Sequence, residues 1–271
     1  MRIPVLAMVC CVLAGCAQVR VTERHFIRPD AAGATTEKRL TGAATNLAVA
    51  GIDGATLNGV LLERPGARST VLYFGGNMFH LDQHGDELLP VLSQCGTNVA
   101  VFDYRGYGRS TGKPTVENMK ADALTLFDAL DARFPGRIIV HGQSLGSFMA
   151  AHVAQARPVL ATVLETTATS AQELVEANIP WYAGPFVRVE MDASLRQVDN
   201  RSAAARFRSP TLVIVAGQDT MTPPRLGKKV FDAIPRADKQ LLLLEKATHN
   251  GALRSHEAGA SYCRFVRGVE P

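Results

Sequence analysis

One stretch of the sequence, residues 138–146, reads Ile-Ile-Val-His-Gly-Gln-Ser-Leu-Gly. Its apolar start, and the helix-forming residues that follow it, predict a strand that turns sharply into a helix at a G-x-S-x-G pattern. Such a turn needs Gly142 and Gly146, because side chains there would collide with neighbouring backbone. It would lift the hydroxyl of Ser144 above the sheet edge, beside the positive end of a helix dipole. Ser144 is therefore the candidate nucleophile, and a helix N-cap without chemistry is the alternative.

A serine hydroxyl becomes a strong nucleophile when a base accepts its proton and an acid orients that base. Asp219 and His249 fit these roles, because each follows an apolar run, at residues 212–216 and 241–244 respectively. The chain order Ser, Asp, His, with each residue after its own strand, favours an acyl-transfer site. Glu165, at the end of an earlier run, is the rival for the acid. The alternative is an ordinary turn aspartate and an ordinary loop histidine.

Negative charge that develops on a substrate oxygen is stabilised by backbone N–H groups that point at it. Leu145, directly after the serine, supplies one such group. The second is expected from the loop Gly75-Gly76-Asn77-Met78, where two glycines allow a close approach of the backbone. We expect the N–H of Asn77 to serve, with that of Met78 as the second choice.

Outside these loops the chain alternates between short apolar runs and segments of helical periodicity, of which 115–134 is the clearest. Runs at 47–52 and 56–62 predict an opening β-hairpin. Strand–helix units after an antiparallel start predict an α/β fold, with a mostly parallel central sheet and helices on both faces. The other strands are expected at 70–74, 98–102, 137–141, 159–164, 210–216 and 239–244.

The segment 166–208 breaks this alternation and is predicted to form a short cap over the site. It contains three aromatic residues, Trp181, Tyr182 and Phe186. They are either substrate contacts, which would favour an apolar acyl group, or the core of the cap.

These pieces together resemble the α/β-hydrolase superfamily, and within it the serine aminopeptidase S33-like/BEM46-like group. The resemblance covers about residues 46–265. Where the group usually has His-Gly in the oxyanion loop, this chain has Gly75-Gly76. The matching stretches are Phe74–Asn77, Asp103–Ser110, Gly142–Gly146, Glu165–Ser170, Gly217–Asp219 and His249-Asn250.

The resemblance implies an α/β-hydrolase domain that cleaves an ester, thioester or amide bond through an acyl-enzyme, with no metal ion or organic cofactor. Its substrate would be a small-molecule or lipid-like acyl compound. Two alternatives keep the fold: a non-catalytic envelope lipoprotein that binds lipid or a partner, and an acyltransferase that uses the same site.

Several other polar residues have simpler interpretations. His80 and His84 lie four residues apart and could face a metal together, but no third ligand is within reach, so a solvated helix start is favoured. The remaining candidates are expected to pack against the nucleophile turn (His141 and His152) or to brace the loop after their strand (Asp103 and Arg105).

The first sixteen residues, MRIPVLAMVCCVLAGC, resemble a bacterial lipoprotein signal. The apolar run is too short to span a bilayer, and Leu13-Ala14-Gly15-Cys16 is similar to a lipobox. This implies a signal peptide over 1–15, acyl chains such as palmitate on Cys16, a tether through residue 45, and a hydrolase domain over 46–271. Ala17 favours the outer membrane, facing the periplasm. A simple secretory signal and a buried N-terminal strand are the alternatives.

The cysteines fit an exported protein. Of the five cysteines, two would leave with the signal peptide and one would be lipidated. Cys95 and Cys263 remain, as a candidate disulfide in an oxidising compartment or as two buried free thiols.

Composition sets the outer bounds. The 271 residues are 46% hydrophobic and 20% charged, with a formal net charge of +4. These values exclude collagen, a long coiled coil and a disordered acidic chain, and they fit one α/β domain. The mild positive charge is not gathered into a block, which argues against nucleic acid as a partner. The oligomeric state is left open.

Overall fold

The computed structural model describes residues 17–30, 40, 42 and 44–271. The predicted signal peptide and the lipidation site at Cys16 lie outside these residues.

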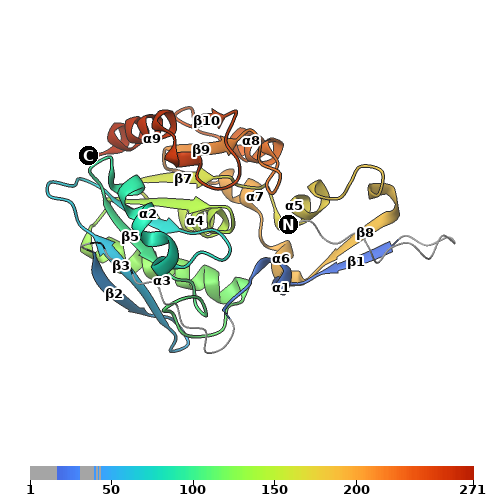
Figure 1. The fold of residues 1–271 in the computed structure, drawn as a ribbon, viewed down its shortest axis with the longest axis horizontal. Helices are drawn as coiled ribbons and strands as arrows, with labels where there is room; N and C mark the ends of the chain where they lie inside the picture. Colours follow the sequence, from blue (N-terminus) through green and yellow to red (C-terminus); the bar gives the residue numbers. More distant parts are fainter. Residues whose placement is uncertain (1–16, 31–39, 41, 43) are drawn as a thin grey trace.

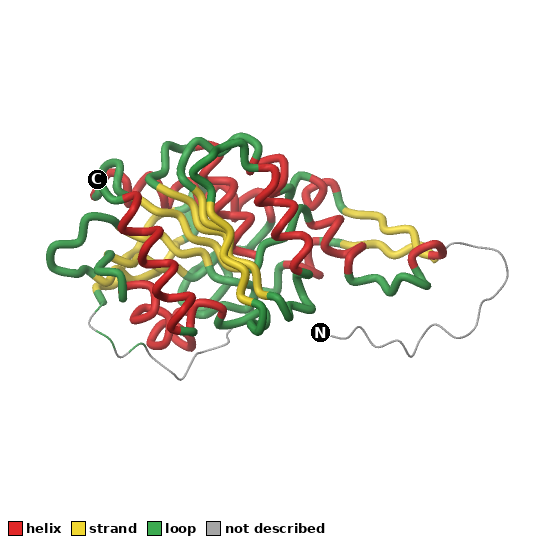
Figure 2. The backbone as a smooth tube through the Cα atoms, turned by 90° about the horizontal axis from the view of Figure 1, so that it is seen from above, coloured by secondary structure: helices red, strands yellow, loops and turns green. Residues whose placement is uncertain are grey.

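An eight-stranded sheet runs through the centre of the described chain, in the order β10-β9-β7-β6-β4-β5-β3-β2 (Figures 1 and 2). All neighbouring strands are parallel except β2 with β3 and β3 with β5. The predicted α/β fold and its antiparallel opening are confirmed. The strands are β2 (Thr45–Ala50), β3 (Thr56–Leu62), β4 (Thr70–Phe74), β5 (Asn98–Phe102), β6 (Ile138–Gln143), β7 (Ala161–Glu165), β9 (Thr211–Ala216) and β10 (Gln240–Leu244).

Helices cover both faces of this sheet. One apolar core lies between the sheet and the helices α3, α4 and α8, and a second lies between the sheet and α2 and α9. Since both faces are covered, the central strands are buried along their whole length and carry no polar alternation. The helices are α2 (Leu81–Ser93), α3 (Val116–Arg133), α4 (Leu145–Ala156), α8 (Pro224–Ala233) and α9 (His256–Val269), with a 3-10 turn η3 (Ala252–Arg254).

The longest helix, α3, begins and ends close to the predicted bounds. Thr115 caps its start, where the side-chain oxygen accepts a hydrogen bond from the N–H of Asn118 at 3.2 Å. The buried residues Val116, Met119 and Ala123 recur at the three- and four-residue spacing that places them on one face.

The cap segment packs against the helices on one face of the sheet and shares their apolar core. It consists of α5 (Ala171–Ala177), a 3-10 turn η2 (Gly184–Phe186), β8 (Val187–Met191), α6 (Ala193–Arg196) and α7 (Asn200–Ala204). Strand β8 extends away from the body of the molecule (Figures 1 and 2).

The residues directly after Cys16 differ from the predicted tether. They form strand β1 (Ala17–Val21) and a one-turn helix α1 (Glu23–Phe26), and β1 pairs in parallel with β8. Val21 and Ile27 are buried in the same core as the cap. A five-residue strand offers a very short periodic pattern, and its partner is far away in the sequence, so the residues alone gave no sign of this pairing.

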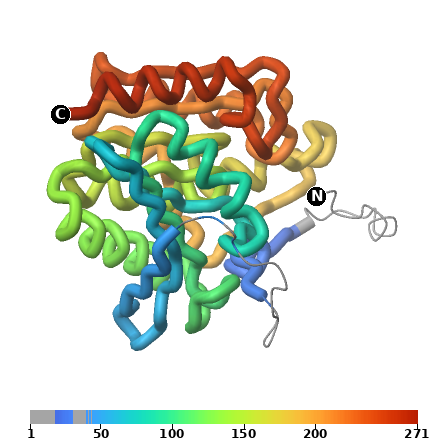
Figure 3. Tube along the Cα trace, turned by 60° about the vertical axis from the view of Figure 1, so that its left-hand side comes forward, coloured from blue at the N-terminus to red at the C-terminus, as the bar shows by residue number. Residues whose placement is uncertain are grey.

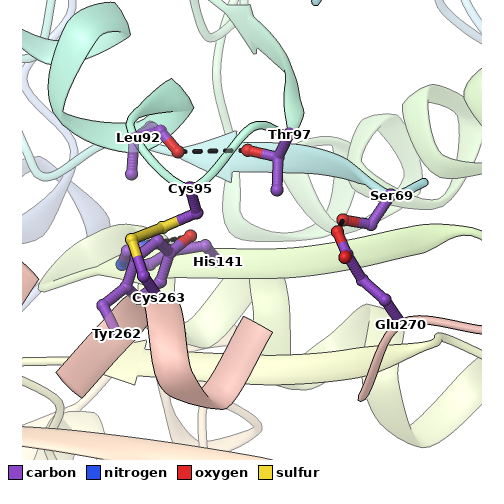
Figure 4. The surroundings of a disulfide bond; sticks show 8 residues. All are labelled: Ser69, Leu92, Cys95, Thr97, His141, Tyr262, Cys263 and Glu270. Carbon is purple, nitrogen blue, oxygen red and sulfur yellow. Dashed lines mark hydrogen bonds between the residues drawn. A yellow bond between two sulfur atoms is a disulfide. The ribbon is translucent and has the colours of Figure 1, made fainter. Parts of the chain in front are cut away.

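Cys95, just after α2, and Cys263, in α9, form a disulfide (Figure 4). Helices α2 and α9 lie on the same face of the sheet, and the bond is buried between them (Figures 1 and 3).

We expect the double substitution Cys95→Ser, Cys263→Ser to lower the free energy of unfolding by about 2–5 kcal/mol, because the bond closes a long loop in the unfolded chain. Guanidinium unfolding, followed with and without a reductant, measures the loss. The reductant should shift the wild-type midpoint and leave that of the variant unchanged. Equal midpoints for the oxidised wild type and the variant would contradict this expectation.

Candidate active site

Ser144 lies at the turn between β6 and α4, in a backbone conformation that residues other than glycine rarely adopt. Its φ is 54° and its ψ is −115°, which is costly for a residue other than glycine. The N–H of Ser144 donates to the carbonyl oxygen of Glu165 at 2.9 Å and fixes the turn against β7. Because α4 begins at Leu145, the N-terminus of that helix lies directly behind the serine.

The two glycines of the turn are required by close backbone contacts. A Cβ on Gly142 would collide with the carbonyl group of Gly146, and a Cβ on Gly146 would collide with the carbonyl oxygen of Phe74. This crossing of backbones brings β4 and its loop next to the serine.

We expect Gly146→Ala to lower the free energy of unfolding by about 3 kcal/mol or more, because rigid backbone must move to admit the methyl group. Gly184→Ala is the matched control, since a Cβ there has nothing within 4 Å. Thermal unfolding compares the two variants. A Gly146→Ala protein as stable as Gly184→Ala would show that the turn is less tightly packed than described.

Three side chains from three different loops meet above the sheet. Nε2 of His249 lies 2.9 Å from Oγ of Ser144, and Nδ1 of His249 lies 2.8 Å from Oδ2 of Asp219. The loops follow β6, β9 and β10, so the meeting point is the carboxyl edge of the parallel strands. Asp219 and His249 are buried. The hydroxyl, the imidazole and the carboxylate thus form one continuous hydrogen-bonded chain.

The carboxylate of Asp219 is held by its own turn as well as by the imidazole. The N–H groups of Met221 and Thr222 each donate to Oδ1 at 2.8 Å, and Oγ1 of Thr222 donates to Oδ2 at 2.6 Å. Burial raises the pKa of Asp219, but the hydrogen bonds from His249 and Thr222 outweigh it and hold the pKa below its ordinary value. The group therefore stays ionised. Sequence reasoning missed the role of Thr222. The signal available was Asp219 itself, because Asp side chains often accept hydrogen bonds from backbone N–H groups two residues on.

We expect Thr222→Val to raise the pKa of Asp219 and to lower the free energy of unfolding at neutral pH by about 1.5–3 kcal/mol. A carboxyl group with a lowered folded pKa stabilises the protein above its unfolded pKa, and this contribution is lost as the pH falls through the folded value. The difference from wild type should therefore shrink below the ordinary pKa of 3.8.

Urea unfolding at neutral pH and at about pH 3 tests this sign. Thr220→Val, an exposed threonine in the same turn, is the control and should change little at either pH. If the loss of unfolding free energy caused by Thr222→Val were larger at about pH 3 than at neutral pH, the role given to the Thr222–Asp219 hydrogen bond would be contradicted.

Glu165, the rival acid, has a different partner. Its Oε2 lies 3.1 Å from Nε2 of His141, and both side chains are buried beneath the serine turn. On the other side of that ring, the hydroxyl of Tyr262 lies 3.4 Å from Nδ1 (Figure 4). The structure thus places Asp219, and not Glu165, beside His249.

The glycine-rich loop after β4 packs against the serine turn. A Cβ on Gly76 would lie 3.6 Å from Cβ of Ser144. The N–H of Met78 donates to Oδ1 of Asn77 at 3.1 Å. Within residues 44–271, the N–H groups of Asn77 and Leu145 have no hydrogen-bond partner, so these two donors are free for another acceptor.

Three side chains hold the loop Gly75–Met78 in place. In the group that this chain resembles, the loop usually contains a histidine instead of Gly75. Tyr104 donates its hydroxyl to the carbonyl of Gly75 at 2.7 Å, and Tyr107 donates to Oδ1 of Asn77 at 3.2 Å. Nδ1 of His80 lies 3.0 Å from the carbonyl oxygen of Met78. Burial raises the pKa of Tyr107 to about 12, so its hydroxyl remains a donor.

The other polar residues have structural partners. Asp103 accepts hydrogen bonds from the N–H groups of Leu81 and Arg109, at 2.7 and 2.9 Å, and Arg105 is buried against Asp122. Both brace the loop after β5. Nε2 of His80 lies 2.5 Å from Oδ1 of Asp30. Among the described residues, no group of three or more His, Cys, Asp or Glu side chains could hold a metal ion.

The aromatic residues of the cap do not form its core. Trp181, Tyr182 and Phe186 are 89%, 63% and 67% exposed, so the cap-core alternative is wrong, and substrate contact by these residues stays a prediction. Apolar side chains do line a small cavity beside Leu145, and they come from α3, α4, the cap and Phe26 and Ile27 of the N-terminal segment. The N-terminal segment and the cap thus both lie close to Leu145, the first residue of α4.

Comparisons with known proteins agree with this architecture. A family model described as serine aminopeptidase, S33, matches residues 65–194, which include Ser144 and end before Asp219 and His249. An uncharacterized protein of Mycobacterium tuberculosis is 29% identical over 92% of this chain and 88% of its own. Protein bem46 of Schizosaccharomyces pombe is 28% identical over 73% of this chain and 68% of its own.

A solved esterase of Pyrococcus furiosus has a TM-score of 0.69 at 18% identity, and the match covers 91% of this chain and 99% of the esterase. The chain therefore has the α/β-hydrolase fold, and the comparisons support a hydrolytic enzyme. None of the helices in the described part of the chain combines the length and apolar character needed to cross a membrane.

Proposed function

We propose that this protein is a serine hydrolase that cleaves an ester, thioester or amide bond through an acyl-enzyme. The observation that supports this most is the hydrogen-bonded chain from Oγ of Ser144 through His249 to Asp219. A serine hydroxyl is a weak nucleophile by itself, and this arrangement supplies both the base and the group that orients the base.

In the first step, Nε2 of His249 accepts the proton of Ser144 while Oγ attacks the carbonyl carbon of the substrate. Asp219 holds the proton on Nδ1, so that Nε2 carries the free electron pair, and its negative charge stabilises the imidazolium that forms. His249 then donates the proton to the leaving group. The acyl group remains on Ser144 until a water molecule, deprotonated by the same imidazole, releases it as an acid.

The negative charge on the carbonyl oxygen needs donors that are already in place. The N–H groups of Asn77 and Leu145 lack partners within the described chain and border the serine, which supports them as the oxyanion hole. Met78 is the weaker candidate, because its N–H already donates to Asn77. None of these steps requires a metal ion or an organic cofactor.

The substrate is proposed to be a small or lipid-like acyl compound. This proposal rests on the hydrolase fold and on the carbonyl chemistry of the Ser144 site. The apolar cavity beside Leu145, about 20 Å³, is too small to hold an acyl chain.

A panel of p-nitrophenyl esters of increasing acyl length tests the enzyme proposal. We expect turnover, with an initial burst of nitrophenol for those esters whose acyl-enzyme is hydrolysed more slowly than it forms. Competing alcohols, added to the same assay, reveal acyl transfer through ester products. Tight binding of the esters without any turnover would contradict the proposal and favour a non-catalytic lipid-binding protein.

We further propose that the chain is a lipoprotein of the bacterial cell envelope, anchored through Cys16 in the outer membrane and facing the periplasm. The lipobox-like sequence supports this, and so does the Cys95–Cys263 disulfide, because such bonds persist in oxidising compartments. Cells fed a clickable palmitate analogue should label the wild-type chain and not Cys16→Ser. Equal labelling of both would contradict the anchor.

A further inference from the structure

The end of the cap carries an unusual concentration of exposed aromatic side chains. Trp181, Tyr182 and Phe186 lie within six residues of one another, before and within the turn that leads into β8. The rings of Trp181 and Tyr182 contact each other edge to face, with centroids 6.0 Å apart. Exposed apolar clusters of this kind usually mark an interaction surface. We name these three residues the cap tip.

The two-stranded β1–β8 ribbon continues the cap tip as one apolar face. In the parallel register Val19 pairs with Val189, and Val21 pairs with Met191. Because side chains alternate across a strand, these residues share one face of the ribbon. Val21 and Met191 are buried in the core, whereas Val19 is 41% exposed. The apolar face thus runs outward from the core toward the cap tip.

The N-terminal residues join the described chain at this same place. Ala17 pairs with Val187, and Val187 directly follows Phe186. Cys16, the proposed site of the acyl anchor, therefore joins the described chain beside the cap tip. An acyl group on Cys16 would bring the cap tip to the membrane surface.

We infer that the cap tip is a membrane-docking surface, which inserts its aromatic side chains into the interface of the bilayer next to the N-terminal anchor. The inference rests on the proposed anchor. Trp and Tyr suit this position, because their rings are apolar while their N–H and O–H groups remain hydrated. Arg188, the exposed neighbour of Val187, forms no ion pair with any described residue, so it is free to meet anionic lipid headgroups.

Docking in this way would fix the orientation of the enzyme. A lipid anchor alone leaves a protein free to rotate about its attachment, whereas a second contact of aromatic side chains holds one face toward the bilayer. The cap, which borders the apolar cavity beside Leu145, would then lie against the lipid phase.

The sequence provides a direct probe, because Trp181 is the one tryptophan of the chain. The full chain is reconstituted into vesicles of phosphatidylcholine and phosphatidylglycerol, with and without brominated acyl chains. Interfacial side chains lie about 5–10 Å into the headgroup and acyl boundary. We therefore expect a blue-shifted emission, about twofold quenching by the brominated lipid, and protection from acrylamide.

The matched control moves the tryptophan to the turn between β2 and β3, at the β2 end of the sheet order and separate from the ribbon (Figures 1 and 3). The variant Trp181→Phe, Ile52→Trp uses a residue that is 69% exposed. Its tryptophan emission should be unchanged by brominated lipid and should be quenched by acrylamide.

Two outcomes would overturn the inference. In the first, the chain does not bind the vesicles. In the second, the chain binds, but acrylamide still quenches the fluorescence of Trp181 and brominated lipid does not. The second outcome would indicate a surface that faces water or a protein partner. The fluorescence does not depend on catalysis, and Ser144→Ala should give the same spectra. A failure here is thereby separate from a failure of the proposed hydrolase activity.

Discussion

Replacing Ser144 by alanine lowers kcat on an ester substrate by about 10⁴–10⁶, the loss expected when the nucleophile of a cooperating set of residues is removed. The attacking oxygen is gone, and the residual rate then comes from water held near the oxyanion donors. KM should change far less, because one hydroxyl group is a small part of the surface that a bound ester would contact.

Steady-state kinetics on a p-nitrophenyl ester, with the folded state checked by circular dichroism, measures this loss. Ser209→Ala is the control, since Ser209 is a buried serine whose hydroxyl bonds to Thr162 away from the site. A Ser144→Ala protein that retains more than about a hundredth of the activity would contradict the mechanism.

Replacing Asp219 by asparagine lowers kcat by about 10⁴, because the amide group favours the wrong tautomer of His249 and cannot stabilise the imidazolium. The structure explains why the fold should tolerate this change. The N–H groups of Met221 and Thr222 donate to Oδ1, and an amide oxygen accepts the same bonds. The loss should therefore appear in kcat and much less in the free energy of unfolding.

Glu165→Gln is the control for this prediction. Glu165 is a second buried carboxyl group, lies at the end of the neighbouring strand β7, and binds His141. Its kcat should stay within about tenfold of wild type, the size of an indirect positioning effect. The reverse pattern, with a large loss for Glu165→Gln and a small one for Asp219→Asn, would make Glu165 the acid.

Much of the fold follows from local sequence patterns. The strands of the sheet and helix α3 are short apolar runs and a clear helical repeat, and each is read within a window of a few residues. The candidate site follows for a related reason. Ser144, Asp219 and His249 each follow an apolar run, and the carboxyl ends of parallel strands meet at one edge of a sheet.

The features that sequence reasoning missed depend on contacts between distant segments. Strand β1 pairs with β8 across most of the chain, and its five residues carry too short a pattern to indicate a strand. The oxyanion loop is held by Tyr104, Tyr107 and His80. Their roles depend on contacts made in the folded structure, and their spacing along the sequence does not indicate them. The exposure of Trp181 likewise depends on where the cap ends.

Labelling with a fluorophosphonate, followed by mass spectrometry of the digested protein, tests the central claim most directly. The reagent reacts with a serine whose proton is removed by a neighbouring base, and it needs no knowledge of the substrate. The account predicts an adduct on the peptide that contains Ser144, and no adduct in Ser144→Ala or His249→Ala. Labelling at another residue, or labelling that persists in both variants, would contradict it.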